Sequence, residues 1–394
     1  MTVKILVVDD EPDLETLLRQ KFRRQIRERE YEFFFAQDGE DALLKIQEAP
    51  DLDIILSDIN MPRMDGLTLL QKVKENDILV KSVIISAYGD MGNIRTAMNR
   101  GAFDFLTKPI DFADLEATLS KTREAIRQIK QAQREHQQLE KLRQELQVAS
   151  NIQSSILPPN SPHFQGRTEF ELYARMVPAM EVGGDFYDYF LIDPDHLGFV
   201  VGDVSGKGVP AAIFMALSRT LLRATALTAR DPQHCLQYVN TVLCREDYQG
   251  MFVTLLYGVL NTRSGEVTLA TAGHEPPFLM RASGAMEMLA LPRNLPLAVE
   301  EGCLFEPRPV MLRPGDAIFV YTDGVTEAEA GGMGFFRKER LGALLESAMR
   351  LPSRDMVTRV FDVVQEFTAG QSQSDDITCL ALRYHGATGA TSDG

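Results

Sequence analysis

The sequence predicts a multidomain protein in which an α/β unit with a parallel sheet is followed by a long helix and then by an α+β unit. Three observations support this order. Strand-like and helix-like patterns alternate through the first 120 residues, residues 111–157 contain neither proline nor glycine, and short β-like runs dominate from about residue 168. A chain of 394 residues is long enough for two or three domains.

Composition excludes several classes of protein. The formal net charge is -15 and no large basic cluster is visible, which argues against a protein that binds duplex DNA. No segment approaches the roughly 20 apolar residues of a membrane span, and the start MTVKILVVDDE does not have the pattern of a signal peptide. The cysteines lack CxxC spacing and are expected to be reduced: Cys235, Cys244, Cys303 and Cys379. We therefore expect a cytoplasmic protein that binds neither nucleic acid nor membranes.

The first unit begins with KILVVDDE, an apolar run that ends in acids, as a buried parallel strand does when its carboxyl end opens on a site. Helical patterns such as PDLETLLRQKFRRQIRE and GEDALLKIQEA separate this run from the strand-like runs that follow. These later runs are residues 31–36, 52–58, 81–87 and 103–109. The alternation predicts a doubly wound α/β domain with a five-stranded parallel sheet.

Three acids come at the ends of predicted strands, Asp9 and Asp10 after the first and Asp58 after the third. Carboxylates that converge at the switch point of such a sheet repel one another unless a cation lies among them, and a site of oxygen ligands suits Mg²⁺. Ser86 ends the fourth strand and Lys108 follows the fifth. A hydroxyl and an ammonium group facing a carboxylate with Mg²⁺ indicate a site that receives a phosphoryl group.

Residues 1–120 resemble the receiver domain of two-component response regulators, on the motifs VVDDE, SDINMP, ISA and TKP. The resemblance implies that a histidine kinase phosphorylates Asp58. It implies a Mg²⁺ site whose ligands are Asp10, Asp58 and the carbonyl of Asn60, with Asp9 assisting. It also implies that Ser86 and Lys108 contact the phosphoryl group and that Phe105 occupies the position of the switching aromatic ring.

The absence of helix breakers from residues 111–157 permits one uninterrupted helix up to the double proline at 158–159. Mostly apolar residues recur with alternating steps of four and three, with one phase slip and with polar Gln133 and His136 weakening the middle. The stripe comprises Leu115, Leu119, Thr122, Ile126, Ile129, Gln133, His136, Leu139, Leu142, Leu146, Ala149 and Ile152. Such a stripe indicates a coiled coil in a parallel homodimer. The alternative is a single helix that lies on its own domains.

The last 240 residues have acids at the ends of short β-like runs, and glycine adjoins several of them. These acids are Asp185, Asp203, Asp323 and the pair Asp375–Asp376. Carboxylates that share a cleft raise one another's pKa, and divalent cations relieve that conflict. Without nearby His or Cys, the ligand set favours Mg²⁺ or Mn²⁺. Two ions about 4 Å apart would hold a bridging hydroxide and orient a phosphate ester.

From about residue 149 to 384 the chain resembles the metal-dependent protein phosphatases of the PPM family, in the branch that contains SpoIIE and RsbU. The motifs are IQSSILP, EVGGDFYD, GDVSGKG, TAGHEPP, YTDGVTEA and SDDIT. The resemblance implies a β-sandwich flanked by helices. It implies that the metal ligands and catalytic residues are Asp185, Asp203, Asp323 and Asp375, with the Val204 carbonyl as a further ligand. Asp376 replaces the Asn of other PPM enzymes and is either a supporting residue or an alternative ligand.

Three departures from the family pattern occur near these motifs. Lys207 stands where His is frequent, Glu275 stands where Asn is frequent, and Met180 stands where other PPM enzymes have a phosphate-binding arginine. His274 is kept, and we expect it to be structural because oxygen ligands suffice for the metal chemistry.

Together these features predict a receiver domain (1–120), a helical coiled-coil linker (121–157), a phosphatase domain (158–385) and a disordered tail (386–394). Phosphorylation of Asp58 would control a serine/threonine phosphatase. By resemblance, its substrate is a phosphorylated STAS-domain anti-sigma-factor antagonist in a partner-switching pathway. The alternatives are a non-enzymatic adaptor that binds a partner through the phosphatase-like domain, and a transcription factor, for which no DNA-reading helix is visible.

Overall fold

The computed structural model describes residues 2–76, 80–87, 89–161, 164, 166–246, 248–331 and 334–386. The chain forms two compact units, residues 1–141 and 142–394, and the helix α6 (Phe112–Ile156) continues from the first into the second. Of the predicted tail at 386–394, all but Gly386 lies outside the described residues. None of the helices in these ranges combines the length and the apolar composition needed to cross a membrane.

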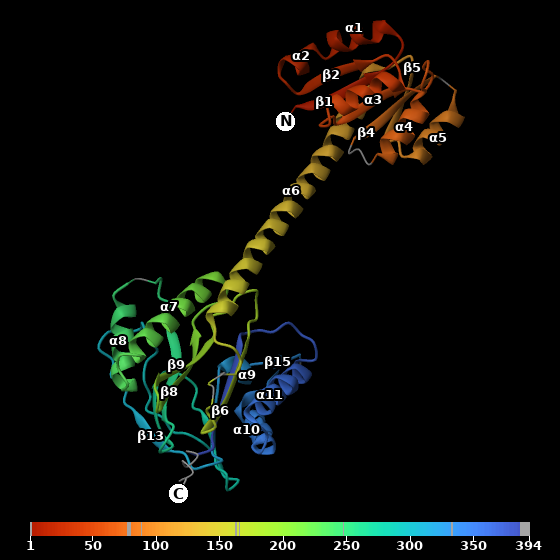
Figure 1. Cartoon of the computed structure of the whole chain (residues 1–394). Helices are drawn as coiled ribbons and strands as arrows, with labels where there is room; N and C mark the ends of the chain where they lie inside the picture. The colour runs from red at the N-terminus through yellow and green to blue at the C-terminus, as the bar shows by residue number, and fades with distance from the viewer. Residues whose placement is uncertain are drawn as a thin grey trace. The chain divides into compact units, whose positions relative to one another are not determined.

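The first unit is a parallel sheet with strand order β2-β1-β3-β4-β5 and helices on both faces (Figure 1). Its strands are β1 (Val3–Val8), β2 (Tyr31–Ala36), β3 (Ile54–Asp58), β4 (Lys81–Ala87) and β5 (Asp104–Lys108). Its helices before α6 are α1 (Pro12–Lys21), α2 (Arg23–Arg27), α3 (Gly39–Glu48), α4 (Gly66–Glu75) and α5 (Met91–Arg100). The predicted five-stranded doubly wound sheet is therefore confirmed.

Apolar side chains on both faces hold the sheet between two layers of helices. One layer contributes Leu14 and Leu18 of α1, whereas α3, α4 and α5 cover the other face. This burial explains why the strands read as continuous apolar runs. The one helix expected over residues 12–28 is divided into α1 and α2 at Phe22, whose ring is fully buried in the core.

The helix α6 contributes to the core of the first unit over its first four turns. Leu115, Leu119 and Ile126 are buried in the same cluster as the strands β1, β3 and β4. These residues and the buried Thr122 form the first part of the stripe that the sequence suggested for self-association. They pack in the core of their own unit and are not available to a second chain. Later residues of the stripe are exposed to solvent, with Leu139 55% exposed and Leu142 52% exposed.

The second unit contains two antiparallel five-stranded sheets, which confirms the predicted β-sandwich flanked by helices (Figure 1). The first sheet has the order β13-β10-β9-β8-β7, and the second has the order β12-β11-β14-β17-β6. The strands of the first sheet are β7 (Phe186–Asp193), β8 (His196–Val204), β9 (Val253–Asn261), β10 (Glu266–Ala272) and β13 (Arg308–Met311). Those of the second sheet are β6 (Phe170–Val177), β11 (Phe278–Met280), β12 (Met286–Met288), β14 (Ala317–Tyr321) and β17 (Ile377–Tyr384). A separate pair is formed by β15 (Glu329–Ala330) and β16 (Gly334–Phe335).

Helices cover the outer face of each sheet. The helices α7 (Val209–Ala226) and α8 (Pro232–Cys244) pack on the first sheet, and α9 (Asp323–Thr326), α10 (Arg337–Ala348) and α11 (Ser353–Thr368) pack on the second. A third apolar cluster fills the space between the sheets. Because helices cover the outer faces and apolar side chains fill the inner faces, polar side chains from both sheets can meet only at the ends of the strands.

A buried ion pair joins the first sheet to α7. The carboxylate of Asp188 on β7 is fully buried and accepts from Arg219, 3.0 Å away, and from Arg223, 2.9 Å away. Replacing Asp188 by Ala leaves the buried Arg219 guanidinium without its counter-charge, which costs about 3–5 kcal/mol. We therefore expect chemical denaturation to show a loss of that size in the second unit.

The matched control is Asp195→Ala, which removes an acid paired with Arg263 at 2.7 Å on the surface. Exposed pairs contribute about 0–1 kcal/mol, so this variant should unfold close to the parent chain. An equal decrease in the free energy of unfolding for the two variants would show that the buried Asp188 pair stabilises the unit no more than an exposed pair does.

Candidate functional site

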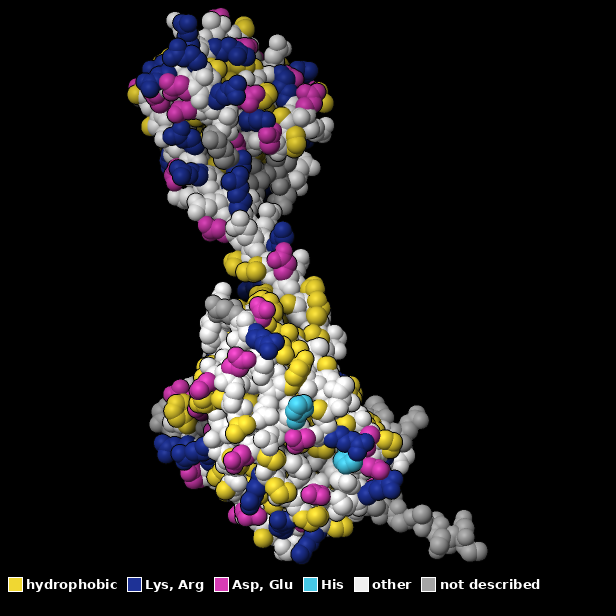
Figure 2. Space-filling model, turned by 90° about the vertical axis from the view of Figure 1, so that its left-hand side faces the viewer, with side chains coloured by type: hydrophobic (Ala, Val, Ile, Leu, Met, Phe, Trp, Pro, Cys, Tyr) yellow, Lys and Arg dark blue, Asp and Glu magenta, His cyan; other side chains and the backbone are white. Residues whose placement is uncertain are grey.

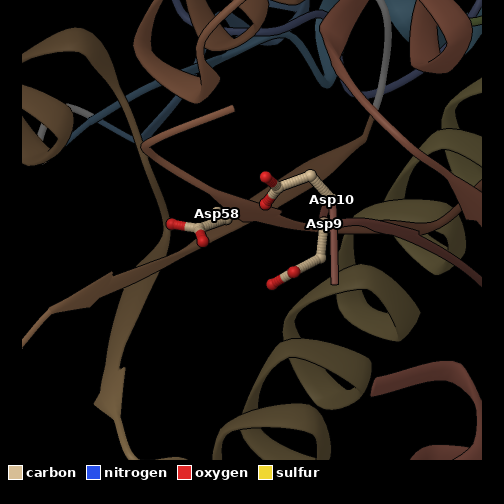
Figure 3. Close-up of side chains that lie close together, drawn as sticks. All are labelled: Asp9, Asp10 and Asp58. Atoms are coloured by element: carbon tan, nitrogen blue, oxygen red, sulfur yellow. The ribbon is translucent and has the colours of Figure 1, made fainter. Parts of the chain in front are cut away.

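The first candidate site lies at the carboxyl ends of β1 and β3, where the strand order reverses. Asp9 and Asp10 follow β1, and Asp58 ends β3. Each of these three acids offers a ligand atom, and all three atoms lie within 4.8 Å of one another (Figure 3). Asp9 and Asp58 are buried while Asp10 is exposed, so the group opens to solvent on one side. The sequence expectation that these acids converge agrees with this geometry.

Lys108, at the end of β5, is the counter-charge of this group. Its Nζ lies 2.6 Å from Asp58, 3.1 Å from Asp9 and 3.0 Å from Glu11. Burial alone lowers the pKa of Lys108, but the hydrogen bonds with Asp58, Glu11 and Asp9 outweigh burial and raise the pKa overall. Burial also raises the pKa of Asp9. The ammonium group therefore stays charged and faces the carboxylate that the sequence assigned as phosphoacceptor.

The remaining predicted receiver residues lie just after β3 or on the neighbouring strands β4 and β5. The backbone N–H of Asn60 donates to Asp58 Oδ1 at 3.2 Å. Ser86 lies one residue before the end of β4, which pairs with β3, and its buried hydroxyl has no hydrogen-bond partner among the described residues. Phe105 on β5 is partly exposed. A buried hydroxyl without a partner, on the strand next to the one that carries Asp58, is available to donate to an additional ligand with oxygen atoms.

The second candidate site combines acids from four separate segments of the second unit. Asp185 precedes β7, Asp203 lies near the end of β8, Asp323 begins α9 and Asp375 precedes β17. The two sheets thus contribute two acids each. The four are more widely spaced than the acids of the first site, since no three described carboxylates of the second unit bring ligand atoms within 4.8 Å of one another.

The charges of these acids nevertheless act on one another. Burial raises the pKa of Asp203 to about 7, with further contributions from Asp323 and Asp375 and an opposing hydrogen bond with Asp185. Burial and then Glu327 and Asp375 raise the pKa of Asp323 to about 6. The pKa of Asp185 is also well above its ordinary value, first because of burial and then because of Asp203. The residues therefore form one carboxylate cluster that lacks sufficient positive charge.

Two hydroxyl groups from the second sheet fix the side chain of Asp185. Thr322 and Thr378 both donate to the same carboxylate oxygen, Oδ2, at 2.7 Å each. Thr322 also accepts from the backbone N–H of Thr378 at 2.9 Å. These contacts orient Asp185 across the gap between the two sheets.

Asp376 has a different role from its neighbour Asp375. Its carboxylate accepts backbone N–H groups from Ala179 at 2.7 Å and from Gly184 at 2.6 Å. Its backbone carbonyl approaches Gly324 so closely that a Cβ there would lie 1.9 Å from the oxygen. Of the two roles that the sequence left open for Asp376, the structure therefore favours support of the segment that carries Asp185.

Lys207 and Val204 lie beside the cluster. Lys207 Nζ lies 3.1 Å from Asp375 Oδ2 and also donates to the carbonyl of Ser374. The carbonyl of Val204 lies close to Gly184, where an added Cβ would come within 2.9 Å of it. A glycine at 184 thus permits the close approach of the chains that carry Asp185 and Asp203.

His274, Glu275 and Met180, the remaining residues compared with the family pattern, have the following surroundings. His274 is buried and its Nδ1 lies 3.1 Å from Thr254 Oγ1, a contact that fits the structural role expected for it. Burial lowers the pKa of His274 to about 4. Glu275 pairs with Lys338 at 2.5 Å, and the exposed Met180 brings no charge to the site.

Both groups of residues fit divalent cations. Each consists of oxygen donors with too little positive charge nearby, which is the donor set of Mg²⁺ and Mn²⁺. In the second site the raised pKa values of Asp203 and Asp323 record the cost of gathering carboxylates without a cation.

This cost predicts an unusual pH dependence for the chelated protein. Unfolded aspartates titrate near pH ~3.9. The folded pKa values of Asp203 and Asp323 are higher, about 7 and about 6. The two protonated groups therefore add to the free energy of unfolding below pH ~4, and this contribution is lost as the pH rises through 6–7. We expect calorimetry of the chelated chain to show the second unit melting at lower temperature at pH ~8 than at pH ~5. Mn²⁺ should reverse the loss at pH ~8.

The variant Asp203→Asn serves as the control, since it removes the carboxyl group with the higher pKa of the two and should make melting depend less on pH. A chelated parent chain whose second unit melts equally at both pH values would contradict the prediction.

Sequence reasoning missed three residues of the second site: Thr322, Thr378 and Gln153. Gln153 on α6 is buried; its Nε2 donates to the Gly183 carbonyl at 2.6 Å, and its Oε1 accepts from the Gly183 N–H at 3.1 Å. All three lie inside motifs quoted above, in YTDG, DDIT and IQSSILP. Membership in those motifs was the available signal, but it did not indicate which atoms they contact.

Comparison with known proteins places these sites in families. The family model described as "Response regulator receiver domain" matches residues 5–120, and the model described as "Stage II sporulation protein E (SpoIIE)" matches residues 193–385. "Protein IcfG" of Synechocystis sp. is 31% identical over 271 residues, which are 61% of this chain and 41% of that protein. The chain therefore spans less than half the length of that relative.

Two further relatives concern the second unit. "Phosphoserine phosphatase RsbU" of Bacillus subtilis is 28% identical over 256 residues, 64% of this chain and 75% of that protein. The solved SiaA-PP2C domain of Pseudomonas aeruginosa has a TM-score of 0.55 at 24% identity, covering 62% of this chain and 98% of that domain, which supports the fold. The chain thus contains a receiver domain of the response-regulator family over residues 5–120, followed by a domain that matches the SpoIIE family over residues 193–385 and has the PPM phosphatase fold.

Proposed function

We propose that the protein is a metal-dependent serine/threonine protein phosphatase whose activity is controlled by phosphorylation of Asp58. The observation that carries this proposal is the gathering of four carboxylates from four distant segments, with too little positive charge among them. Such a cluster is costly in a folded protein, and its residue types are the ligands of divalent cations.

The second site would hold two Mn²⁺ or Mg²⁺ ions through Asp185, Asp203, Asp323 and Asp375, with the Val204 carbonyl as a further donor. Ions bound there would supply an activated water and neutralise the phosphate ester. Asp376, Thr322 and Thr378 keep Asp185 in place through the hydrogen bonds described above.

The receiver site would hold one Mg²⁺ through Asp10, Asp58 and the Asn60 carbonyl, with Asp9 assisting. Asp58 would accept the phosphoryl group from a histidine kinase. Lys108 already contacts the Asp58 carboxylate and would stay with the phosphorylated side chain. The Ser86 hydroxyl, which has no partner among the described residues, would bind a phosphoryl oxygen, and Phe105 would respond to that movement.

The proposed substrate is a phosphoserine or phosphothreonine on a STAS-domain anti-sigma-factor antagonist, whose dephosphorylation would release a sigma factor by partner switching. The similarity to RsbU of Bacillus subtilis, a phosphoserine phosphatase, supports the proposed substrate class. On the visible face of each unit, Lys and Arg side chains lie among Asp and Glu side chains (Figure 2), so we propose no nucleic-acid partner. We place the protein in the cytoplasm.

A homodimer through α6 belongs to the same proposal. The support is the exposure of Leu139 and Leu142 on the part of the helix beyond the receiver core. Two such helices would bury these side chains against each other.

Control by the receiver requires a path to the catalytic acids, and α6 offers one. The helix starts in the receiver core at Leu115 and Leu119, and its last turns carry Gln153. Gln153 binds both backbone groups of Gly183, two residues before Asp185. A movement of the helix would therefore act on the position of a proposed metal ligand.

The test is Mn²⁺-dependent hydrolysis of p-nitrophenyl phosphate by the full chain, with and without beryllofluoride as a stand-in for phosphorylated Asp58. Metal-dependent turnover that changes with beryllofluoride is the expected result. Turnover that is indifferent to beryllofluoride would remove the control by the receiver. Absence of turnover with metal bound would instead favour the adaptor.

The path through α6 is examined with Gln153→Ala, which should hydrolyse the ester but lose its response to beryllofluoride. The matched control is Gln144→Ala, which changes an exposed residue of the same helix and should respond as the parent chain does. An equal response of all three proteins would exclude Gln153 from the path.

A further inference from the structure

We propose that Lys207 is the residue that binds the phosphoryl group of the substrate in the second site. This inference rests on the proposed phosphatase function and adds to it a contact made by the chain itself. Lys207 lies in the GKG turn at residues 206–208, which is separated by one residue from the end of β8, so it is close in the chain to the proposed metal ligand Asp203.

The position of Lys207 is fixed at the rim of the carboxylate cluster. Gly206 and Gly208 have φ angles of 88° and 74°, so the turn needs glycine on both sides of the lysine. The side chain is 40% exposed and its Nζ reaches Asp375, which is 36% exposed, at 3.1 Å. A second contact to the Ser374 carbonyl holds the ammonium group on the same side. Lys207 thus faces both the cluster and solvent, from which a substrate arrives.

Charge explains why this lysine is needed. Four carboxylates and two divalent cations sum to zero, whereas a phosphate monoester brings about −1.5 to −2 charges at pH 7. Among the described residues, Lys207 is the one basic side chain that forms an ion pair with any of the four acids. Met180, whose sulfur lies 3.9 Å from the Cβ position of Gly208, adds no charge.

The contact between Lys207 and Asp375 is therefore exchangeable. When Asp375 shares its charge with a cation, the ammonium group loses most of the attraction that holds it there. An incoming phosphate then offers acceptor oxygens of higher charge within reach of the same side chain. Because both partners are partly exposed, exchanging one for the other requires no buried charge to be left alone.

The experiment titrates inorganic phosphate into the Mn²⁺-loaded full chain by calorimetry, and titrates Mn²⁺ into the metal-free chain separately. Lys207→Met should bind phosphate at least about tenfold more weakly, as the loss of a charge-assisted hydrogen bond predicts. Its affinity for Mn²⁺ should be equal to or tighter than that of the parent chain, because Asp375 loses a competing cation. Lys207→Arg should keep most of the phosphate affinity.

Lys338→Met is the matched control, since Lys338 is similarly exposed at 41% but pairs with Glu275 instead of with one of the four acids. It should bind phosphate as the parent chain does. Unchanged phosphate affinity in Lys207→Met, or loss of Mn²⁺ binding in that variant, would overturn the inference and leave Lys207 as a structural partner of Asp375. A parent chain that binds no Mn²⁺ would instead overturn the proposed function, and this inference with it.

Discussion

Replacement of Asp203 by Asn will reduce Mn²⁺-dependent hydrolysis of p-nitrophenyl phosphate by about 10³-fold or more. The charges of Asp323 and Asp375 act on Asp203, and Asp203 also shares a hydrogen bond with Asp185, so it occupies the middle of the proposed ligand set. An amide of the same shape keeps the packing but removes the negative charge that a divalent cation requires. The loss of several kcal/mol of transition-state stabilisation corresponds to at least that factor.

The fold should survive this change, because an amide relieves the repulsion that raises the pKa of Asp203. Circular dichroism and thermal unfolding of the metal-free chain test that point. Asp355→Asn, at an exposed acid in the first turn of α11, is the matched control and should retain full activity. Substantial turnover by Asp203→Asn would mean that the proposed assignment of metal ligands is wrong.

Replacement of Asp58 by Asn will abolish phosphorylation of the receiver and, with it, the response of the second unit to beryllofluoride. The Asp58 carboxylate is buried among Asp9, Asp10 and Lys108, so no neighbouring group reproduces its position. An amide is not nucleophilic enough to accept a phosphoryl group and contributes no charge to a Mg²⁺ site. Intact-protein mass spectrometry after incubation with acetyl phosphate measures the first effect directly.

The control for this experiment is Asp51→Asn, which changes an acid that pairs with Lys4 on the surface of the same unit. It should gain one phosphoryl group as the parent chain does. Phosphorylation of Asp58→Asn to the same extent would place the acceptor elsewhere, and a retained response to beryllofluoride would mean that the response does not pass through Asp58.

The sequence alone was enough to predict most of the helices and strands and to identify the acids that follow strands. The first-unit strands agree closely with the apolar runs, because residues buried on both faces must be apolar throughout. Likewise, the acids Asp9, Asp58 and Asp203 were recognisable because each comes at or near the end of such a run.

What the sequence did not contain was the identity of long-range partners. Asp185 is held by Thr322 and Thr378, which are 137 and 193 positions away, and local patterns carry no information about such distances. The same limit applies to α6, where the spacing of Leu115 and Leu119 predicts an apolar face without saying that the unit's own sheet covers it.

The hydrogen bonds to Asp185 also bear on which ion the second site would select. Both threonine hydroxyls occupy Oδ2, so one oxygen of this carboxylate is already engaged and the other is the one left for a ligand. A carboxylate tied in this way offers a single donor atom and resists the bidentate mode. Ca²⁺ readily accepts bidentate carboxylates and higher coordination numbers, whereas Mg²⁺ requires a compact octahedron. If Asp185 is a metal ligand as proposed, the two threonines would therefore make it favour Mg²⁺ over Ca²⁺.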